Sequence, residues 1–303
     1  MNILIVHDQP LPVFTYGGTE RVIWALAKEL VGLGHQVSFL LPKGSFCEFA
    51  KVYEYHSNKP LNEQIPNHID VVHFQKEPTE AIEKPYLVTI HGNGNETKKF
   101  DERYVFVSKN HAQRHGSNQF VYNGLDWDSY ATPDLSMHRQ RFHFLGNAAW
   151  RVKNVRGAIE IIKQTPEEEL DVLGGYRFNF KMGLRFTFSR RIHFHGMVGG
   201  EEKFRLLNQS KGLLFPVLWP EPFGLAITES LFFGCPVFGT PNGSLPELIS
   251  EEFGFLSAQP NELSEALLDT GNYDSRKCHE YARDVFNSKQ MALNYLQFYE
   301  RLI

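Results

Sequence analysis

Short apolar runs alternate with amphipathic stretches along most of the chain. The run 2–7 is continuously apolar, which predicts a buried strand. Residues 19–34 have apolar positions at helical spacing, with Thr19 as the expected N-cap and Gly34 as the expected stop. The apolar run 35–41 follows as a second strand. Strand, helix and strand in this order predict a right-handed βαβ unit with parallel strands.

The same alternation continues through the rest of the chain. Further strands of the first half are expected at 70–74, 86–91, 104–108 and 119–123. The second half is expected to have strands at 142–146, 169–175, 191–196, 212–217 and 236–240, and helices at 154–164, 200–210, 225–234, 244–250 and 260–270. Continuous apolar strands are typical of sheets that are covered on both faces. The pattern predicts an α/β fold of two Rossmann-like domains in tandem.

A polar, proline-containing segment without strong periodicity, 124–140, separates the two halves. We expect an N-terminal domain at 1–135, a C-terminal domain at 136–287 and a final amphipathic helix at 288–303. The apolar stripe of this helix is expected to hold Met291, Tyr295, Phe298 and Leu302. Ligands of open α/β sheets bind beyond the carboxyl ends of the strands, so the default site is a cleft between the two domains.

Composition narrows the functional classes. The 303 residues carry a formal net charge of −4, so no global basic field would attract nucleic acid. The three cysteines are scattered without a C-x-x-C pair, which indicates neither a zinc site nor a disulfide framework and fits a reducing compartment such as the cytoplasm. Residues 1–10 lack a basic segment before the apolar run and predict a strand, not a signal peptide. No apolar run approaches a membrane span, so at most peripheral membrane contact is expected.

Several familiar chemistries lack their motifs. The first strand is followed by a long proline-containing loop and not by G-x-G-x-x-G, which argues against a nicotinamide enzyme. G-x-x-x-x-G-K-[ST], H-E-x-x-H and G-x-S-x-G are also absent from the sequence. His193 and His195 alternate along one predicted strand, but without a third candidate ligand nearby they indicate packing and not a metal site.

Three loops at strand ends have the composition of anion-binding turns. Residues 16–18 (YGG) and 222–225 (PFGL) each open a predicted helix, where glycine lets the backbone approach a ligand and free N–H groups face an anion. Residues 150–154 (WRVKN) place Arg151 and Lys153 in a similar loop. Three such loops indicate a ligand that carries a diphosphate.

Two glutamates flank the second of these turns. Glu221 precedes it, and Glu229 lies about two helical turns inside an otherwise apolar helix. A carboxylate accepts hydrogen bonds from two adjacent hydroxyls, as on a sugar or a ribose. The pair is therefore suited to hold two hydroxyl-bearing parts of one ligand, although the spacing alone does not fix the distance between the two side chains.

The stretch EPFGLAITESLFFGCPVFGTPNGSLPELI, from Glu221 onward, resembles the donor-binding signature of retaining glycosyltransferases with the GT-B fold, family 4 in particular. Other segments agree in order: YGGTERV, GHQVSFL, TIHG, FVSKN, VYNGLD, HFHGMV and the closing helix. The resemblance covers nearly the whole chain. It implies a GT-B fold in which the last helix crosses back onto the first domain.

The resemblance also implies a role for each matching residue. Glu221 would hold hydroxyls of the transferred sugar, His91 would face that sugar, and Lys153 would neutralise the diphosphate. The remaining donor-binding positions are Gly17 and Gly18 over the phosphates, Phe223, Gly224 and Leu225 through backbone N–H groups, Glu229 at the ribose, and Met197 and Val198 at the base.

One position departs from the family pattern. The family usually has arginine directly after the glycine that ends the first strand of the second domain, and Asn147 stands there in this chain. Losing a charge-assisted contact would weaken stabilisation of the departing diphosphate. Arg151, two residues before Lys153, is the candidate replacement.

The implied reaction is metal-independent, retaining transfer of a sugar, of hexosyltransferase type, from a nucleotide diphosphate sugar to an acceptor hydroxyl in glycan, lipopolysaccharide or other glycoconjugate biosynthesis. No cofactor is expected besides the donor, whose base (UDP or GDP type) stays open. The acceptor is open between a saccharide, a lipid-linked saccharide and a small molecule; the acidic balance of residues 1–135 favours a soluble acceptor or one presented by a partner. The alternative is a relative without transferase activity: an epimerase, a hydrolase or an inactive binding subunit.

Overall fold

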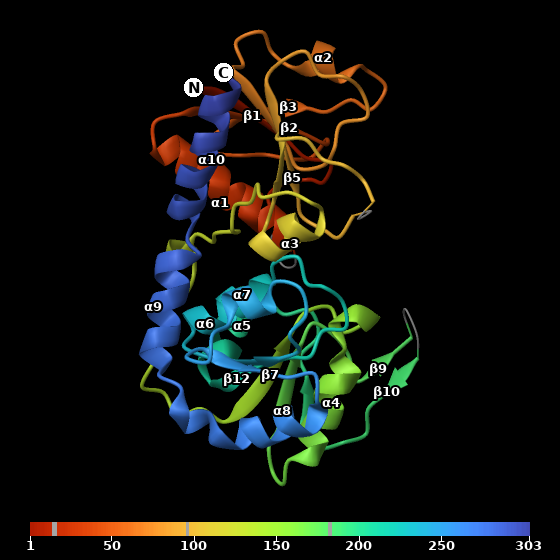
Figure 1. The fold of residues 1–303 in the computed structure, drawn as a ribbon, viewed down its shortest axis with the longest axis vertical. Helices are drawn as coiled ribbons and strands as arrows, with labels where there is room; N and C mark the ends of the chain where they lie inside the picture. The colour runs from red at the N-terminus through yellow and green to blue at the C-terminus, as the bar shows by residue number, and fades with distance from the viewer. Residues whose placement is uncertain (14–16, 95–96, 181–183) are drawn as a thin grey trace. The chain divides into compact units, whose positions relative to one another are not determined.

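The computed structural model describes residues 1–13, 17–94, 97–180 and 184–303. The chain forms two compact units. The first unit comprises Met1–Trp127 and Phe286–Ile303, and the second comprises Asp128–Val285 (Figure 1). The chain thus leaves the first unit once, builds the second, and returns to the first.

A six-stranded parallel sheet forms the first unit, in the order β3-β2-β1-β4-β5-β6. Its strands are β1 (Asn2–Val6), β2 (Gln36–Leu41), β3 (Lys51–Glu54), β4 (Val71–Phe74), β5 (Tyr86–Ile90) and β6 (Tyr104–Phe106), and its helices are α1 (Gly18–Gly32), α2 (Leu61–Gln64), α3 (Lys109–Arg114) and α10 (Ser288–Leu302). The strand order reverses between β1 and β4. Ligand sites of open α/β sheets lie at such a reversal, beyond the carboxyl ends of the strands.

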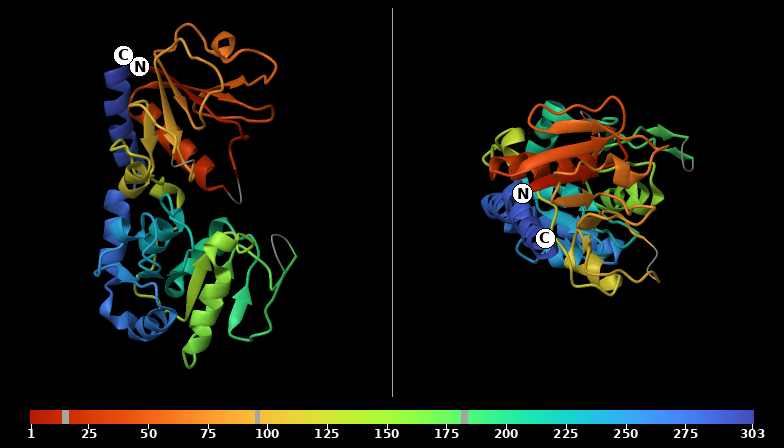
Figure 2. Two further views of the ribbon diagram at one scale, coloured as in Figure 1. Left: turned by 45° about the vertical axis from the view of Figure 1, so that its right-hand side comes forward. Right: turned by 90° about the horizontal axis from the view of Figure 1, so that it is seen from above.

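The last helix, α10, belongs to the first unit, where it packs beside α1 and β5 (Figure 2). Two buried tyrosine hydroxyls join it to the sheet: Tyr299 lies 2.7 Å from Nδ1 of His73, and Tyr295 lies 2.8 Å from the Thr89 hydroxyl. The crossing-back helix implied by the resemblance is therefore confirmed. Its buried residues differ from the predicted stripe, because Ala292 and Tyr299 are buried whereas Phe298 and Leu302 are only partly so.

The second unit repeats the design with a parallel sheet in the order β11-β8-β7-β12-β13-β14. Its strands are β7 (Arg141–Leu145), β8 (Leu170–Leu173), β11 (Ile192–Phe194), β12 (Ser210–Phe215), β13 (Val237–Gly239) and β14 (Gly254–Leu256). A small antiparallel pair, β9 (Phe178–Asn179) and β10 (Arg185–Phe186), lies between β8 and β11 in the chain. The helical segments are η2 (Arg151–Lys153), α4 (Val155–Gln164), α5 (Gly200–Asn208), α6 (Leu225–Phe232), α7 (Leu245–Leu248), α8 (Pro260–Ala266), η3 (Leu267–Asn272) and α9 (Ser275–Val285), and η1 (Trp127–Ser129) lies at the start of the unit.

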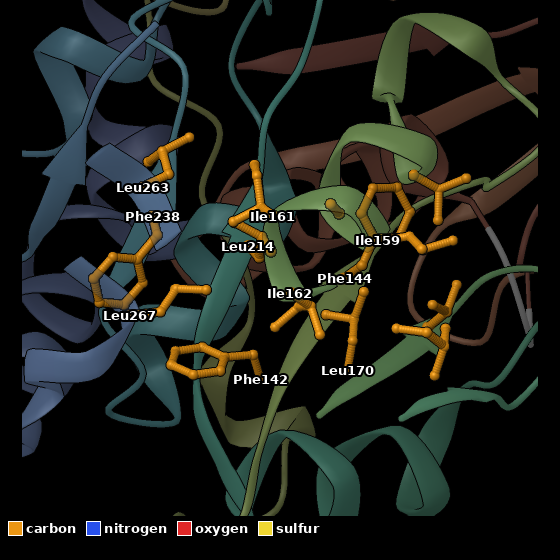
Figure 3. Packing of buried hydrophobic residues seen from close by; sticks show 14 of the residues in the cluster. Phe142, Phe144, Ile159, Ile161, Ile162, Leu170, Leu214, Phe238, Leu263 and Leu267 are labelled. Atoms are coloured by element: carbon orange, nitrogen blue, oxygen red, sulfur yellow. The ribbon is translucent and has the colours of Figure 1, made fainter. Parts of the chain in front are cut away.

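The core of the second unit fixes where its strands end. Side chains of β7, α4, β13 and α8 converge in one apolar cluster, with the rings of Phe142 and Phe238 packed edge to face at 5.8 Å (Figure 3). Ile159 and Ile162 of α4 fill the space beside Phe144. Because β7 and α4 are held on both sides of the loop 146–154, the polar side chains of that loop are presented at the carboxyl edge of the sheet.

Two local predictions need correction and a third is confirmed. Thr19 is not the cap of α1: the helix begins at Gly18 with Gly17 as its N-cap. Residues 119–123 form no strand, because the pairing is limited to one bridge between Phe106 and Phe120. Gly34 does stop the helix, with φ of +88°, a conformation that glycine adopts without steric cost.

The boundary between the units lies after Trp127, whereas the sequence placed it after residue 135. Side-chain contacts explain the difference. Tyr130 donates a hydrogen bond to Glu229, and the backbone N–H of Asp134 donates to the side chain of Asn208. The polar segment thus packs on the second unit, and its low periodicity does not mark a free linker.

Candidate functional site

An ion pair between Lys153 and Glu221 lies at the carboxyl edge of the second sheet. Nζ of Lys153 is 2.7 and 2.9 Å from the two carboxylate oxygens of Glu221. The indole N–H of Trp219 donates to the same carboxylate at 2.7 Å. The two charged side chains are 13% and 7% exposed, so the pair is largely removed from water but not sealed. The pair holds the ammonium and the carboxylate in fixed positions, and both groups are still partly accessible to a ligand.

Local backbone geometry holds this pair. Asn154 ends η2 in the left-handed conformation (φ 58°), and its side chain both accepts from the N–H of Gly157 and donates to the carbonyl of Pro216. This ties the Lys153 loop to the segment after β12. On the other side, Gly243 (φ +66°) approaches Glu221 so closely that an added Cβ would lie 2.2 Å from the Glu221 nitrogen. Only glycine fits that position.

The start of α6 follows directly. Gly224 is its N-cap, with φ of 91°, and no side chain caps the helix. Phe223 is 2% exposed, and its carbonyl accepts a hydrogen bond from the Ser244 hydroxyl. Leu225 is half-buried. The first N–H groups of an α-helix have no partner within the helix, so the backbone here is suited to an anion, as the sequence predicted.

Glu229, inside α6, has a different environment from Glu221. It is 2% exposed, and its Oε1 accepts from the Tyr130 hydroxyl at 2.7 Å and forms an ion pair with Lys203 of α5. Lys203 is itself buried. The two glutamates therefore each pair with a lysine of their own, and Glu229 is the more deeply buried of the two.

The other predicted donor residues lie on the same edge of the second unit. Asn147 follows β7, where its side-chain oxygen accepts from the N–H of Ala149, so the residue shapes the turn. Arg151 is exposed at the start of η2. Met197 (37% exposed) and Val198 (half-buried) follow β11.

In the first unit, polar residues directly follow three neighbouring strands. His7 follows β1, Gln75 follows β4 and His91 follows β5. Nε2 of His91 donates to the amide oxygen of Gln75 at 2.8 Å. Desolvation lowers the pKa of His91 to about 3, so its ring is neutral at pH 7. The ring nitrogens of His7 and the amide nitrogen of Gln75 are buried, with no hydrogen-bond partner among the described residues.

The entrance to α1 adjoins this cluster. Nε2 of His7 lies 3.9 Å from the carboxylate of Glu20, and His7 is the main cause that lowers the pKa of Glu20. Gly17 is buried and could not carry a side chain without displacement, because an added Cβ would lie 2.7 Å from Val13 and 2.8 Å from Glu20. Gly18 is half-buried as the first residue of α1. Tyr16 of the predicted YGG turn lies outside the described residues.

Two further features bear on the class of site. In the described ranges, His, Cys, Asp and Glu side chains form no group of three or more that would hold a metal ion. His193 pairs with Glu169, directly before β8, at 2.8 Å, and His195 pairs with Asp171 of β8 at 2.7 Å, so both histidines have carboxylate partners. Within that same part of the chain, no helix combines the length and the apolar character needed to cross a bilayer.

The sequence did not single out several residues that the structure brings to these sites: His7, Glu20, Gln75, Tyr130, Lys203 and Trp219. For two of them a signal was present. His7 and Gln75 directly follow apolar strands, as His91 does. No signal of that kind marks Lys203, which looks like an ordinary charge in an amphipathic helix.

Comparisons with known proteins bear on the family and the fold. Residues 139–271 match the family model described as glycosyl transferases group 1. The chain is 24% identical over 280 residues to D-rhamnosyltransferase WbpZ of Pseudomonas aeruginosa, covering 80% of this chain and 69% of that protein. It is 30% identical over 116 residues to an uncharacterized 41.2 kDa protein in the cps region of Klebsiella pneumoniae, covering 36% of this chain and 32% of that protein. The matched region thus spans about a third of the Klebsiella protein.

Solved structures share the fold over the full length. AviGT4, a glycosyltransferase involved in avilamycin A biosynthesis, superposes with a TM-score of 0.76 at 20% identity, covering 99% of this chain and 97% of that one. Alr3699/HepE of Anabaena, solved with UDP-glucose, gives a TM-score of 0.72 at 15% identity with both chains fully covered. Residues 139–271 therefore match the glycosyl transferases group 1 family model, and the whole chain shares the α/β fold, with two six-stranded parallel sheets, of its GT-B glycosyltransferase structural neighbours.

Proposed function

We propose that the chain is a retaining glycosyltransferase of family 4. It transfers a sugar from a nucleotide diphosphate sugar to an acceptor hydroxyl in the cytoplasm, without a metal ion or other cofactor. The observation that carries the proposal is the Lys153–Glu221 pair beside the uncapped start of α6. Binding a sugar diphosphate requires a hydrogen-bond acceptor for the sugar hydroxyls next to hydrogen-bond donors for the phosphates. This edge of the sheet offers both.

Each group has a role in the proposed reaction. The Glu221 carboxylate accepts hydrogen bonds from sugar hydroxyls, while Trp219 fixes its orientation. The ammonium of Lys153 and the N–H groups of Phe223, Gly224 and Leu225 stabilise the negative charge that grows on the diphosphate as the bond to the sugar breaks. Arg151, which is exposed on the same loop, takes the place of the arginine that Asn147 replaces.

Glu229 binds the nucleotide ribose in this proposal, and Met197 and Val198 contact the base. Lys203 and Tyr130 hold the Glu229 carboxylate in one orientation, so it accepts ribose hydroxyls in one geometry. The UDP-glucose complex of Alr3699/HepE supports a nucleotide sugar as donor for this fold.

The first unit supplies the acceptor side. His91 is neutral and held by Gln75, so it contacts the transferred sugar through hydrogen bonds and not through charge. Gly17 and Gly18 let the start of α1 approach the phosphates closely. D-rhamnosyltransferase WbpZ is a bacterial sugar transferase, which supports glycan assembly as the setting.

The test combines donor binding with turnover. A calorimetric panel of UDP-, GDP- and ADP-sugars on the wild-type protein should identify one donor that binds. With that donor, slow hydrolysis in the absence of acceptor should fall by about 10²-fold or more in Glu221→Gln and Lys153→Met, because each variant removes a group that acts on the reacting sugar phosphate. The configuration of the released or transferred sugar, read by NMR, should match that of the donor.

Glu252→Gln is the matched control, since Glu252 is an exposed carboxylate of the same unit paired with Lys277. It should bind and hydrolyse the donor as the wild type does. If no nucleotide sugar binds to the wild-type protein, or Glu221→Gln hydrolyses donor at the wild-type rate, the transferase proposal fails. Binding without any turnover would instead identify an inactive binding subunit, and inversion of configuration would overturn the retaining mechanism alone.

A further inference from the structure

An exposed tyrosine follows β8 after two glycines. Tyr176 is 64% exposed, although the strand before it is fully buried. Its ring lies over Gly196, because a Cβ added to that glycine would be 3.2 Å from Cε1 and 3.4 Å from Cζ of the ring. An aromatic ring that is braced by backbone and otherwise open to solvent is suited to stack against a flat partner.

The backbone around this ring is held in place. Gly175 forms an isolated antiparallel bridge with Gly196, directly beneath the ring. The carbonyl of Tyr176 accepts a hydrogen bond at 2.8 Å from Arg185, which is itself only 7% exposed. The position of the ring is therefore set before any ligand binds.

Tyr176 also adjoins the candidate donor site of the second unit. The N–H of Ala148, in the loop that carries Lys153, donates to the carbonyl of Gly174 at 2.8 Å. On the other side, the glycine beneath the ring directly precedes Met197. Tyr176 thus lies between the loop of the candidate phosphate-binding lysine and the segment proposed to contact the base.

The tyrosine ring forms one side of a pocket of about 710 Å³. Sites for small organic ligands typically have volumes of about 300–1,000 Å³. The pocket is lined by aromatic rings, two histidines and one arginine: Tyr176, Arg177, Phe178, His193, Phe194 and His195.

The charges around this pocket favour an uncharged ligand group. His193 and His195 are paired with the carboxylates of Glu169 and Asp171, at 2.8 and 2.7 Å. The guanidinium of Arg177 donates to three backbone carbonyls of its own unit. A phosphate here would meet two carboxylates and an arginine that is already hydrogen-bonded, whereas a neutral ring with donors and acceptors on its edge would meet no repulsion.

We propose that Tyr176 is the stacking platform for the base of the nucleotide sugar. The inference rests on the proposed function, since it adds a residue to the same donor site. The diphosphate extends towards Lys153, and the base lies on the tyrosine ring beside Met197. Every base has a flat π-face, so the ring contributes affinity for purine and pyrimidine donors alike.

Calorimetry with UDP, GDP and ADP tests the inference. The nucleoside diphosphate that binds the wild type should bind Tyr176→Ala at least about fivefold more weakly, because losing one stacked aromatic ring typically costs that much or more. Inorganic pyrophosphate has no base and should not distinguish the two proteins. Tyr176→Trp should restore the affinity, and its added tryptophan emission should be quenched by the nucleoside diphosphate and not by pyrophosphate.

Phe188→Ala is the matched control, because it removes a ring of the same unit that is 79% exposed and does not line the pocket. It should bind the nucleoside diphosphate as the wild type does. Equal binding by the wild type and Tyr176→Ala, an equal loss in Phe188→Ala, or quenching of Tyr176→Trp by maltose in place of the nucleotide would overturn this inference alone. A wild type that binds no nucleoside diphosphate and no nucleotide sugar would overturn the proposed function together with it.

Discussion

Replacing Lys203 with methionine should destabilise the second unit by about 3–4 kcal/mol at pH 7. Lys203 and Glu229 form an ion pair whose side chains are 9% and 3% exposed. Methionine keeps the apolar stem of the lysine, so the main loss is the charge that balances Glu229. The carboxylate would then be buried with the Tyr130 hydroxyl as a remaining donor to its Oε1.

The magnitude has an upper bound. Breaking a buried ion pair by removing one partner typically costs about 3–5 kcal/mol. The variant has another state available, in which Glu229 takes up a proton. For a carboxyl with an ordinary pKa of about 4.3, protonation costs about 3.7 kcal/mol at pH 7 and about 1 kcal/mol at pH 5. The charge penalty therefore cannot greatly exceed 3.7 kcal/mol at pH 7, and it should shrink by about 2–3 kcal/mol at pH 5.

Urea unfolding followed by circular dichroism at both pH values measures this difference. Lys203→Met/Glu229→Gln should recover most of the stability lost in the single variant, because no unpaired charge stays buried. Lys277→Met is the control: its partner Glu252 is 51% exposed, so its loss should stay within about 0.5 kcal/mol. Equal losses for Lys203→Met and Lys277→Met, or a penalty that is the same at pH 7 and pH 5, would refute the reasoning.

Two further predictions concern a buried histidine of β7 and the place where α10 joins the first unit. Burial lowers the pKa of His143 to about 3, while the unfolded chain takes up that proton near pH 6.5, so the contribution of this ring is complete above about pH 6.5 and is lost as the pH falls towards 3. Urea unfolding of the wild type and His143→Asn should show that the fall in stability from pH 7 to pH 5 is smaller in the variant by roughly 2 kcal/mol; identical pH dependence would contradict this. Gly124→Ala would place a Cβ 2.1 Å from the carbonyl oxygen of Asn287, where α10 joins the first unit, and should cost about 1–3 kcal/mol in the same assay. Gly32→Ala, with open space around the new Cβ, should be neutral, and an equal loss there would show that the crowding is not the cause.

The fold class could be predicted from the sequence because parallel strands covered on both faces are continuously apolar. The run at residues 2–7 and the helix that Gly34 stops are recognisable without any contact partner. The strand predicted at 119–123 was wrong. An apolar run forms a strand only where its backbone pairs with the edge of a neighbouring strand, and here the pairing is limited to one bridge, between Phe120 and Phe106.

The antiparallel pair β9 and β10 shows a different limit. Alternation of aromatic and polar residues at 176–188 is visible in the sequence, and the usual interpretation would bury the aromatic face. The structure buries Arg185 instead, because the Tyr176 carbonyl, the Thr187 hydroxyl and the Phe194 ring contact its guanidinium. Which face of an amphipathic strand points inward depends on partners about nine residues away, which only the fold brings into contact.

The sequence by itself determined the two α/β halves, the glycine-containing turn at 222–225 and the carboxylates at 221 and 229, because these depend on local periodicity and on residues that are close in the chain. Only the tertiary structure decided what each carboxylate meets. Lys153 is 68 positions from Glu221 and Lys203 is 26 positions from Glu229, and both pairs form because parallel strands bring their carboxyl ends to one edge of the sheet and fix the helices beside it. The charge of a buried carboxylate is set by such neighbours, so its chemistry follows from the fold and not from its place in the motif.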